Sequence, residues 1–253
     1  MLAQGAELTE DHSIFSTHYG LGQIIALGWE HYRKHFVSIL LIFLIVYIPI
    51  NIGLSFVPHP NENLGLRGFP IYMILYFTKF LIGVVATMSL ARLIEASLLA
   101  QPITWQQALR HAVSRWGACL CTGLLEGLIV LGMFLLLIVP GIIWGLYYTF
   151  YVYVVALRGL SGKRALDYSK AIVKGQWWRV FGYLFMIEII GAIAGIAVVV
   201  PFYFTPDNRF LEIVSYTVTD ILSALFLCMT IVFFLSNDKK TGDKTGESAL
   251  LNK

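Results

Sequence analysis

Apolar runs of about twenty residues recur along the chain, separated by shorter segments in which polar residues are frequent. A helix needs about twenty residues to cross a bilayer core of about 30 Å, because each residue advances the axis by about 1.5 Å. The pattern therefore predicts an all-α integral membrane fold with about six transmembrane helices. Their expected positions are residues 36–57, 70–94, 117–139, 141–157, 180–204 and 213–236.

The apolar stretch 117–157 is too long for one span, since a single helix of this length would measure about 60 Å. The dipeptide Pro140-Gly141 is the expected break, because proline and glycine both disfavour a continuing helix. Neither flank of the dipeptide carries a polar side chain. A tight turn at the far interface and a re-entrant pair covered by neighbouring helices both fit this pattern.

Polar segments before the first, third and fifth spans carry apolar residues at helical spacing on one side only. They predict amphipathic helices at about 20–35, 104–116 and 161–176, each lying at the membrane interface. Thr104 and Gln107 have the spacing of a capping box at the start of the second helix. The second and third segments share the pattern Thr/Ser-x3-Ala-Leu-x2-Ala/Ser, which indicates an internal duplication. We expect three transmembrane hairpins, each preceded by a cytoplasmic amphipathic helix.

Composition excludes an ordinary water-soluble domain, because 58% of the 253 residues are hydrophobic and only 13% are charged. Of the 18 Lys and Arg residues, only Arg67 and Arg209 fall in the loops opposite the amphipathic segments. Retained loops collect basic residues on the cytoplasmic side, so both termini are expected in the cytoplasm. Residues 1–236 form one polytopic membrane domain in this interpretation, and residues 237–253 form a disordered tail.

Four ionisable residues fall inside predicted spans: Lys79, Glu126, Glu188 and Asp220. A charge at the bilayer centre costs about 2.5–3.5 kcal/mol or more, so each needs a partner or a cavity. All four lie at comparable depth, and an ion pair of Lys79 with Glu126 or Glu188 is the expected arrangement. The cluster fits a proton or ion pathway, a polar site for a lipid headgroup, or a buried pair that fixes helix register.

Glycine pairs at four-residue spacing predict close helix packing, namely Gly123 with Gly127, Gly141 with Gly145, and Gly191 with Gly195. A basic and aromatic group in the third amphipathic segment suits anionic headgroups on the cytoplasmic leaflet. Its members are Lys163, Arg164, Lys170, Lys174, Trp177, Trp178 and Arg179. The same charges also serve as a topology signal, which is the alternative interpretation.

Three stretches resemble the bacterial YciC-like inner-membrane proteins: LLLIVPGII at 135–143, GLSGKRAL at 159–166, and VKGQWWR at 173–179. The chain is similar also to the membrane domain attached to some glycerophosphodiester phosphodiesterases. The resemblance covers most of residues 15–236 and is sharp over about 105–180. It implies a six-helix module of the bacterial cytoplasmic membrane. It does not imply phosphodiesterase chemistry, which belongs to a separate soluble barrel in that family.

The leading functional hypothesis is a non-enzymatic membrane-organising or accessory module that contacts lipid or a partner through its basic interfacial helices. A transporter or channel for a proton, ion or small solute is one alternative, and a membrane-embedded lipid enzyme is another. Expected partners are membrane lipids with anionic headgroups, a protein partner, or a second copy of the chain, and not nucleic acid. No catalytic motif, metal site or cofactor site is expected, although His31 and His35 stand four residues apart.

Overall fold

The structure is a computed structural model that describes residues 20–56, 69–203 and 208–251. All regular elements in these ranges are helical. They are α2 (Leu21–Lys34), α3 (Phe36–Ser55), α4 (Phe69–Leu98), α5 (Trp105–Leu136), α6 (Ile138–Tyr148), α7 (Tyr151–Tyr153), the π-helix η3 (Val154–Arg158), α8 (Lys163–Val173), α9 (Trp177–Tyr203) and α10 (Arg209–Leu251).

Six helical stretches in the described chain are long and apolar enough to cross a membrane. They are Phe36–Ser55, Met73–Leu98, Trp105–Leu136, Ile138–Arg158, Trp177–Phe202 and Arg209–Asp238. Each contains the greater part of one predicted span. The prediction of an all-α, multi-pass membrane protein is therefore confirmed by the length and composition of its helices.

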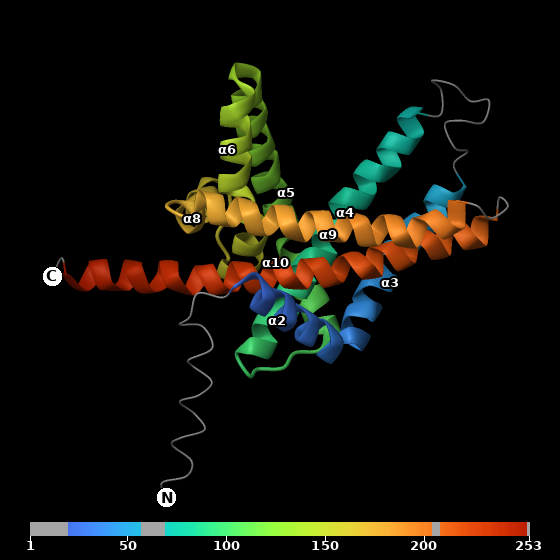
Figure 1. The fold of residues 1–253 in the computed structure, drawn as a ribbon, viewed down its shortest axis with the longest axis horizontal. Helices are drawn as coiled ribbons and strands as arrows, with labels where there is room; N and C mark the ends of the chain where they lie inside the picture. The colour runs from blue at the N-terminus through green and yellow to red at the C-terminus, as the bar shows by residue number, and fades with distance from the viewer. Residues whose placement is uncertain (1–19, 57–68, 204–207, 252–253) are drawn as a thin grey trace, which may run out of the picture.

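Consecutive helices pack against each other in the pairs α3 with α4, α5 with α6, and α9 with α10. Figure 1 shows α9 and α10 side by side along the longest axis, with α5 and α6 projecting together away from them. Helix α10 also contacts α2, α3 and α4, and α4 contacts α5. Helices α10 and α4 thus connect all three pairs.

Buried side chains concentrate in one half of most of these helices. In α5 the buried residues end at Thr122, whereas Leu124, Leu131 and Leu135 in the following turns are exposed. Large buried side chains such as Met88, Phe150 and Phe233 belong to the region where α4, the α7 turn and α10 meet. The bundle therefore has a packed end, beside α2 and α8, and a splayed end whose exposed apolar side chains suit contact with lipid tails.

The break between the third and fourth spans differs from the prediction by three residues. Leu137 is extended, with φ −160° and ψ 143°, and it is the one residue between α5 and α6. Pro140 lies in the first turn of α6, where the backbone N–H has no helical partner and proline is tolerated. The two helices contact each other, so the connection is a tight turn.

The amphipathic segments pack differently from the expectation. Thr104 and Gln107 form the predicted capping box, with Gln107 N donating to Thr104 Oγ1 at 3.3 Å. However, the helix continues without interruption into the span as α5. The apolar face of α8, represented by Leu166 and Ile172, is buried within the protein. It packs against α6, α5 and α10 rather than facing a lipid interface.

The end of α10 also departs from the prediction. The helical backbone continues to Leu251, whereas a disordered tail was expected from residue 237. Asn237 and Asp238, the first residues of that tail, are buried, with 1% and 4% of their surface exposed. Asp238 forms ion pairs and a hydrogen bond, described below, which hold this part of the chain against the bundle.

In each predicted glycine pair, only one glycine makes a close contact with another segment of the chain. A Cβ on Gly123 would lie 2.6 Å from Tyr151 Oη, and one on Gly191 would lie 3.3 Å from the Phe226 ring. Gly141 packs on the ring of Phe134. The other members do not make close contacts, since a Cβ would meet nothing within 4 Å at Gly127 and Gly195, and only Val130 at 3.8 Å at Gly145. The prediction of close helix packing was therefore wrong for Gly127, Gly145 and Gly195.

Gly28 on α2 offers a test of the packed end. A Cβ there would lie 2.6 Å from Met229 Cγ and 2.9 Å from Met229 Cα on α10. We expect Gly28→Ala to lower stability by about 1–3 kcal/mol, because the Met229 backbone cannot move aside freely. Gly22→Ala on the same helix is the control, since its Cβ would meet nothing within 4 Å. The apparent melting temperature in detergent checks this, and equal values for the two variants would contradict the tight contact.

Candidate functional site

Lys79 lies in an ion pair that joins three helices. Its Nζ is 2.9 Å from Asp220 Oδ2 on α10 and donates to Asn51 Oδ1 on α3 at 3.0 Å. Asn51 Nδ2 in turn donates to Asp220 Oδ2 at 2.8 Å. The rings of Tyr47 and Tyr216 lie 5.4 and 5.6 Å from the ammonium group. The cation therefore has a charged partner, an amide partner and aromatic neighbours.

The predicted partners of Lys79 were wrong, because the carboxylate it meets belongs to Asp220 and not to Glu126 or Glu188. The depth of a residue in the membrane can be estimated by counting residues along a span. Which helices lie next to each other cannot be deduced in this way. Since α4 contacts both α3 and α10, its lysine faces the carboxylate of α10. The closed set of interactions favours a structural role that fixes how α3, α4 and α10 align.

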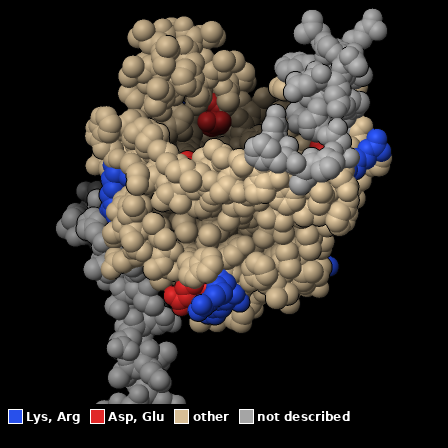
Figure 2. Space-filling model, turned by 45° about the vertical axis from the view of Figure 1, so that its right-hand side comes forward, with Lys and Arg blue, Asp and Glu red and all other residues tan. Residues whose placement is uncertain are grey.

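Glu126 and Glu188 stand apart from this pair. Neither carboxylate makes a hydrogen bond or ion pair with a residue in the described ranges 20–56, 69–203 and 208–251. Glu188 is exposed and lies on the wall of a hollow of about 560 Å³ between α6, α9 and α10. Figure 2 shows a hollowed face with acidic atoms inside it, while the visible Lys and Arg side chains lie at the margins of that face.

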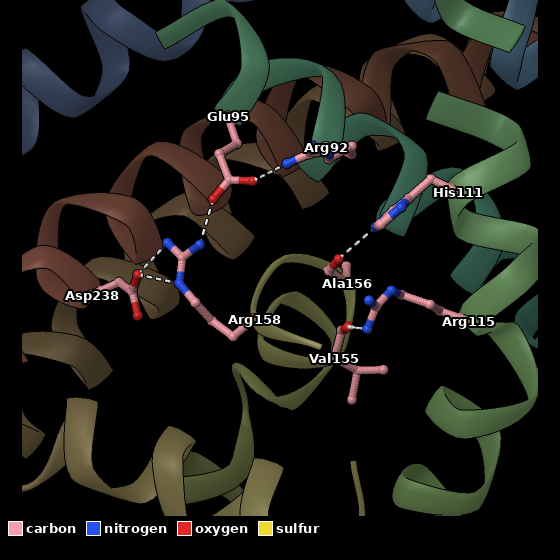
Figure 3. A network of polar contacts seen from close by, with 8 residues as sticks. All are labelled: Arg92, Glu95, His111, Arg115, Val155, Ala156, Arg158 and Asp238. Atoms are coloured by element: carbon pink, nitrogen blue, oxygen red, sulfur yellow. Dashed lines mark hydrogen bonds and ion pairs between the residues drawn. The ribbon is translucent and has the colours of Figure 1, made fainter. Parts of the chain in front are cut away.

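Sequence reasoning missed a second polar network, which is centred on Arg158 at the end of the π-helix η3 (Figure 3). Arg158 Nη1 is 2.6 Å from Glu95 Oε1, and Arg158 Nε donates to Asp238 Oδ2 at 2.9 Å. Arg158 Nη2 also pairs with Asp238. Arg92 binds the other oxygen of Glu95 at 2.8 Å. Both carboxylates are buried, so the guanidinium group of Arg158 ties α4 to α10.

The same network includes α8 and the wide turn of η3. Tyr168 Oη donates to Asp238 Oδ1 at 2.8 Å. Burial and this hydrogen bond raise the pKa of Tyr168 to about 12, so the phenol keeps its proton at neutral pH. His111 Nε2 lies 2.8 Å from the carbonyl of Ala156, and Arg115 Nη1 lies 3.5 Å from that of Val155 (Figure 3). Side chains of α5 thus bind carbonyls of the π-helical turn.

A sequence signal for this network existed. Glu95 interrupts an apolar helix, and Asp238 follows directly after the last apolar run. Arg92 and Arg158 were interpreted only as markers of the cytoplasmic side, and Asp238 was assigned to the tail. A basic residue at the end of one span and an acidic residue at the end of another could have been considered as partners.

Four members of the predicted group are exposed, and we call them together the α8 basic face: Lys163, Arg164, Lys174 and the adjoining Trp178. The exposed Asp167 lies on the same helix. The three basic side chains are exposed, and Trp178 is 78% exposed. Lys170 is engaged within the protein, because its Nζ lies 4.0 Å from the ring centre of Trp144. Arg179 lies over the ring of Tyr183 at 5.5 Å.

Trp177 is not part of the exposed face, because its ring stacks on Phe181 with a centroid distance of 5.3 Å. Its indole nitrogen is buried without a hydrogen-bond partner among the described residues. Of the predicted group, the structure therefore leaves Lys163, Arg164, Lys174 and Trp178 available to a ligand.

Comparison of the chain with protein families, with curated proteins and with solved structures yields no match. The resemblance to YciC-like proteins gains no support from these comparisons. The site must be interpreted from its own residues.

The identity of the partner of Lys79 can be tested by charge removal. We expect Lys79→Met to lower stability by about 3–5 kcal/mol, because it leaves the Asp220 carboxylate, only 13% exposed, without a cation. Adding Asp220→Asn should recover most of the loss, whereas adding Glu188→Gln should recover none. Thermal unfolding of the three proteins in detergent measures this, and recovery by Glu188→Gln would show that the pairing is wrong.

The Arg158 network makes a second prediction. Arg158→Gln removes the cation shared by Glu95 and Asp238, and we expect a loss of about 3–5 kcal/mol in stability. Arg92→Gln is the control, because Glu95 keeps its pair with Arg158 and the expected loss is about 0–1 kcal/mol. Hydrogen exchange should show faster opening of α10 around Asp238 in the first variant only. Similar exchange in both variants would contradict a central role for Arg158.

Proposed function

We propose that this protein is a non-enzymatic membrane-organising or accessory module that binds anionic lipid headgroups at the α8 basic face. In this proposal it belongs to the bacterial cytoplasmic membrane. Its three hairpins are each led by an amphipathic helix, and both termini lie in the cytoplasm. The positive-inside distribution of Lys and Arg supports this orientation. The observation that carries the functional proposal is the exposure of Lys163, Arg164 and Lys174 on a helix whose opposite face is buried.

The buried face of α8 is what makes its basic face suited to binding. Side chains such as Ala165 and Val173 are fully buried. The helix therefore cannot rotate about its axis to bring its exposed cations against acidic residues of the protein. The backbone that carries the exposed cations is therefore held in place. A headgroup that binds here needs to order only the side chains and not the backbone, which lowers the cost in conformational entropy. Each basic residue near an anionic leaflet contributes about 1 kcal/mol.

The aromatic residues support a location at the membrane surface. Trp178 is exposed at the start of α9, one turn beyond the end of α8. Indole rings favour the headgroup level, because they combine an apolar body with a polar N–H group. A lipid whose phosphate meets Lys174 would therefore have an aromatic contact nearby. A protein partner with an acidic surface is the alternative ligand for the same face.

Transport of a proton, ion or small solute is the second candidate. The carboxylate of Glu188 on the wall of the hollow is the observation that favours it. Lys79 does not support this candidate, since its charge is already paired with Asp220. A membrane-embedded lipid enzyme is the third candidate, and no contact among the described residues favours it.

The lipid proposal can be tested with a matched pair of triple variants. Lys163, Arg164 and Lys174 are all changed to Gln in the first, and the exposed Arg33, Lys34 and Arg110 are changed to Gln in the second. Both variants lose the same net charge. Purified proteins in an uncharged detergent are titrated with short-chain phosphatidylglycerol, with tryptophan fluorescence as the readout.

We expect the first variant to bind phosphatidylglycerol at least about tenfold more weakly, and the second to bind like the unmodified protein. Binding by the unmodified protein should also weaken with added salt. Short-chain phosphatidylcholine should bind weakly to all three proteins. Equal affinity in the first variant and the unmodified protein, or equal losses in both variants, would refute a specific role of the α8 basic face.

A further inference from the structure

The hollow between α6, α9 and α10 has the size and lining of a small-molecule site. Its volume is about 560 Å³, within the range of about 300–1,000 Å³ that is common for such sites. The rings of Phe181, Phe185 and Phe226 contribute to its wall. Gly191 and Gly195 on α9 also line it, and a Cβ on Gly195 would meet nothing within 4 Å. The absence of side chains at these positions keeps the space open.

Three hydroxyl groups on one side of this hollow act as acceptors, while Thr149 and Tyr153 also line it. Thr219, Ser223 and Thr230 lie on its α10 side, and each donates its hydroxyl hydrogen to a carbonyl of its own helix. The acceptors are the carbonyls of Ser215 at 2.8 Å, Asp220 at 2.6 Å and Phe226 at 3.0 Å. With their hydrogens engaged, these hydroxyl groups offer only oxygen lone pairs to the hollow. On the α10 side, a ligand must therefore supply positive charge or hydrogen-bond donors.

Glu188 adds a negative charge that the described protein does not balance. No Lys, Arg or His is among the residues that line the hollow. The carboxylate of Glu188 forms neither a hydrogen bond nor an ion pair with the part of the chain that the structure describes. A carboxylate in apolar surroundings is costly without a partner, so a cation beside it would be stabilising.

The residues that line the hollow distinguish between kinds of cation. A metal ion requires several ligating side chains, and no group of three His, Cys, Asp or Glu residues is found within the described ranges. Aromatic rings, in contrast, stabilise organic cations through their faces and give apolar contact to the rest of the molecule. The acceptor set and the aromatic walls together favour a cation with an apolar body.

We propose that this hollow binds a lipophilic organic cation, whose charge pairs with Glu188 and whose apolar body contacts the phenylalanine rings. The site is separate from the Lys79 pair, which already contains its own cation. It is also separate from the α8 basic face, whose charge would repel such a ligand. The proposal therefore does not depend on the lipid-binding function.

The test uses tetraphenylphosphonium as the probe and full-length protein in nanodiscs of phosphatidylcholine. Equilibrium binding is measured with radiolabelled probe, and excess unlabelled probe defines the saturable part. Triphenylphosphine oxide, a neutral molecule of similar shape, serves as competitor. The variants are Glu188→Gln, which removes the charge, and Gly195→Leu, which fills the hollow from a position with open space. Glu126→Gln is the matched control, because it removes a carboxylate of α5 that does not line the hollow.

We expect saturable binding to the unmodified protein and to Glu126→Gln, and affinity lower by about tenfold or more in Glu188→Gln. Gly195→Leu should also weaken binding, with Glu188 still present, which keeps the test valid if Glu188→Gln does not fold. The neutral competitor should displace little probe. Absence of saturable binding, equal affinity in Glu188→Gln and Glu126→Gln, or full displacement by the neutral competitor would each overturn the proposal.

Discussion

The ion pairs of Arg158 hold together the end of the bundle where most of the buried side chains lie. One guanidinium group meets Glu95 of α4 and Asp238 of α10, and Tyr168 of α8 binds the same aspartate. Guanidinium groups suit this position, because their donors point in several fixed directions and the charge is retained at any physiological pH. Arg158 and Asp238 thereby place three helices that are far apart in the sequence relative to one another.

The two ends of the bundle meet different physical requirements. At the packed end, α2 and α8 cover the core with their apolar faces and leave polar side chains outside. At the splayed end, apolar side chains such as Leu135 of α5 and Ile193 of α9 are exposed. Between helices in lipid there is little hydrophobic driving force, so close packing needs polar contacts or small residues. The polar contacts of Arg158 occur at the packed end, and those of Lys79 join α3, α4 and α10.

The helical, multi-pass character of the chain could be predicted from its apolar runs, because their length is fixed by the thickness of a bilayer. The capping box at Thr104 was also predictable, since it depends on residues three apart. The break at Leu137 was not, because proline restricts the first turn of a helix less than its interior and thus marks a boundary only approximately.

The candidate site was predicted in part. Asp220 and Lys79 were identified as charged residues inside spans, where a charge without a partner is energetically unfavourable. Their pairing could not be predicted, because it depends on which helices are in contact. The Arg158 network was missed, because basic residues next to spans were interpreted only through the rule for membrane orientation. Glu188 was found because it interrupts an apolar helix, whereas the hollow beside it comes from helix spacing that no local pattern encodes.

The π-helix at Val154–Arg158 makes this part of the chain sensitive to a change in length. A π turn arises when one residue is added to an α-helix, and each added residue turns the following side chains by about 100° around the axis. Loss of that residue by deletion would carry Arg158 away from both of its carboxylates, although every chemical group would remain in the sequence. The length of this segment therefore matters for the position of Arg158 as much as its composition does, and a one-residue deletion here should disturb the bundle more than a conservative substitution.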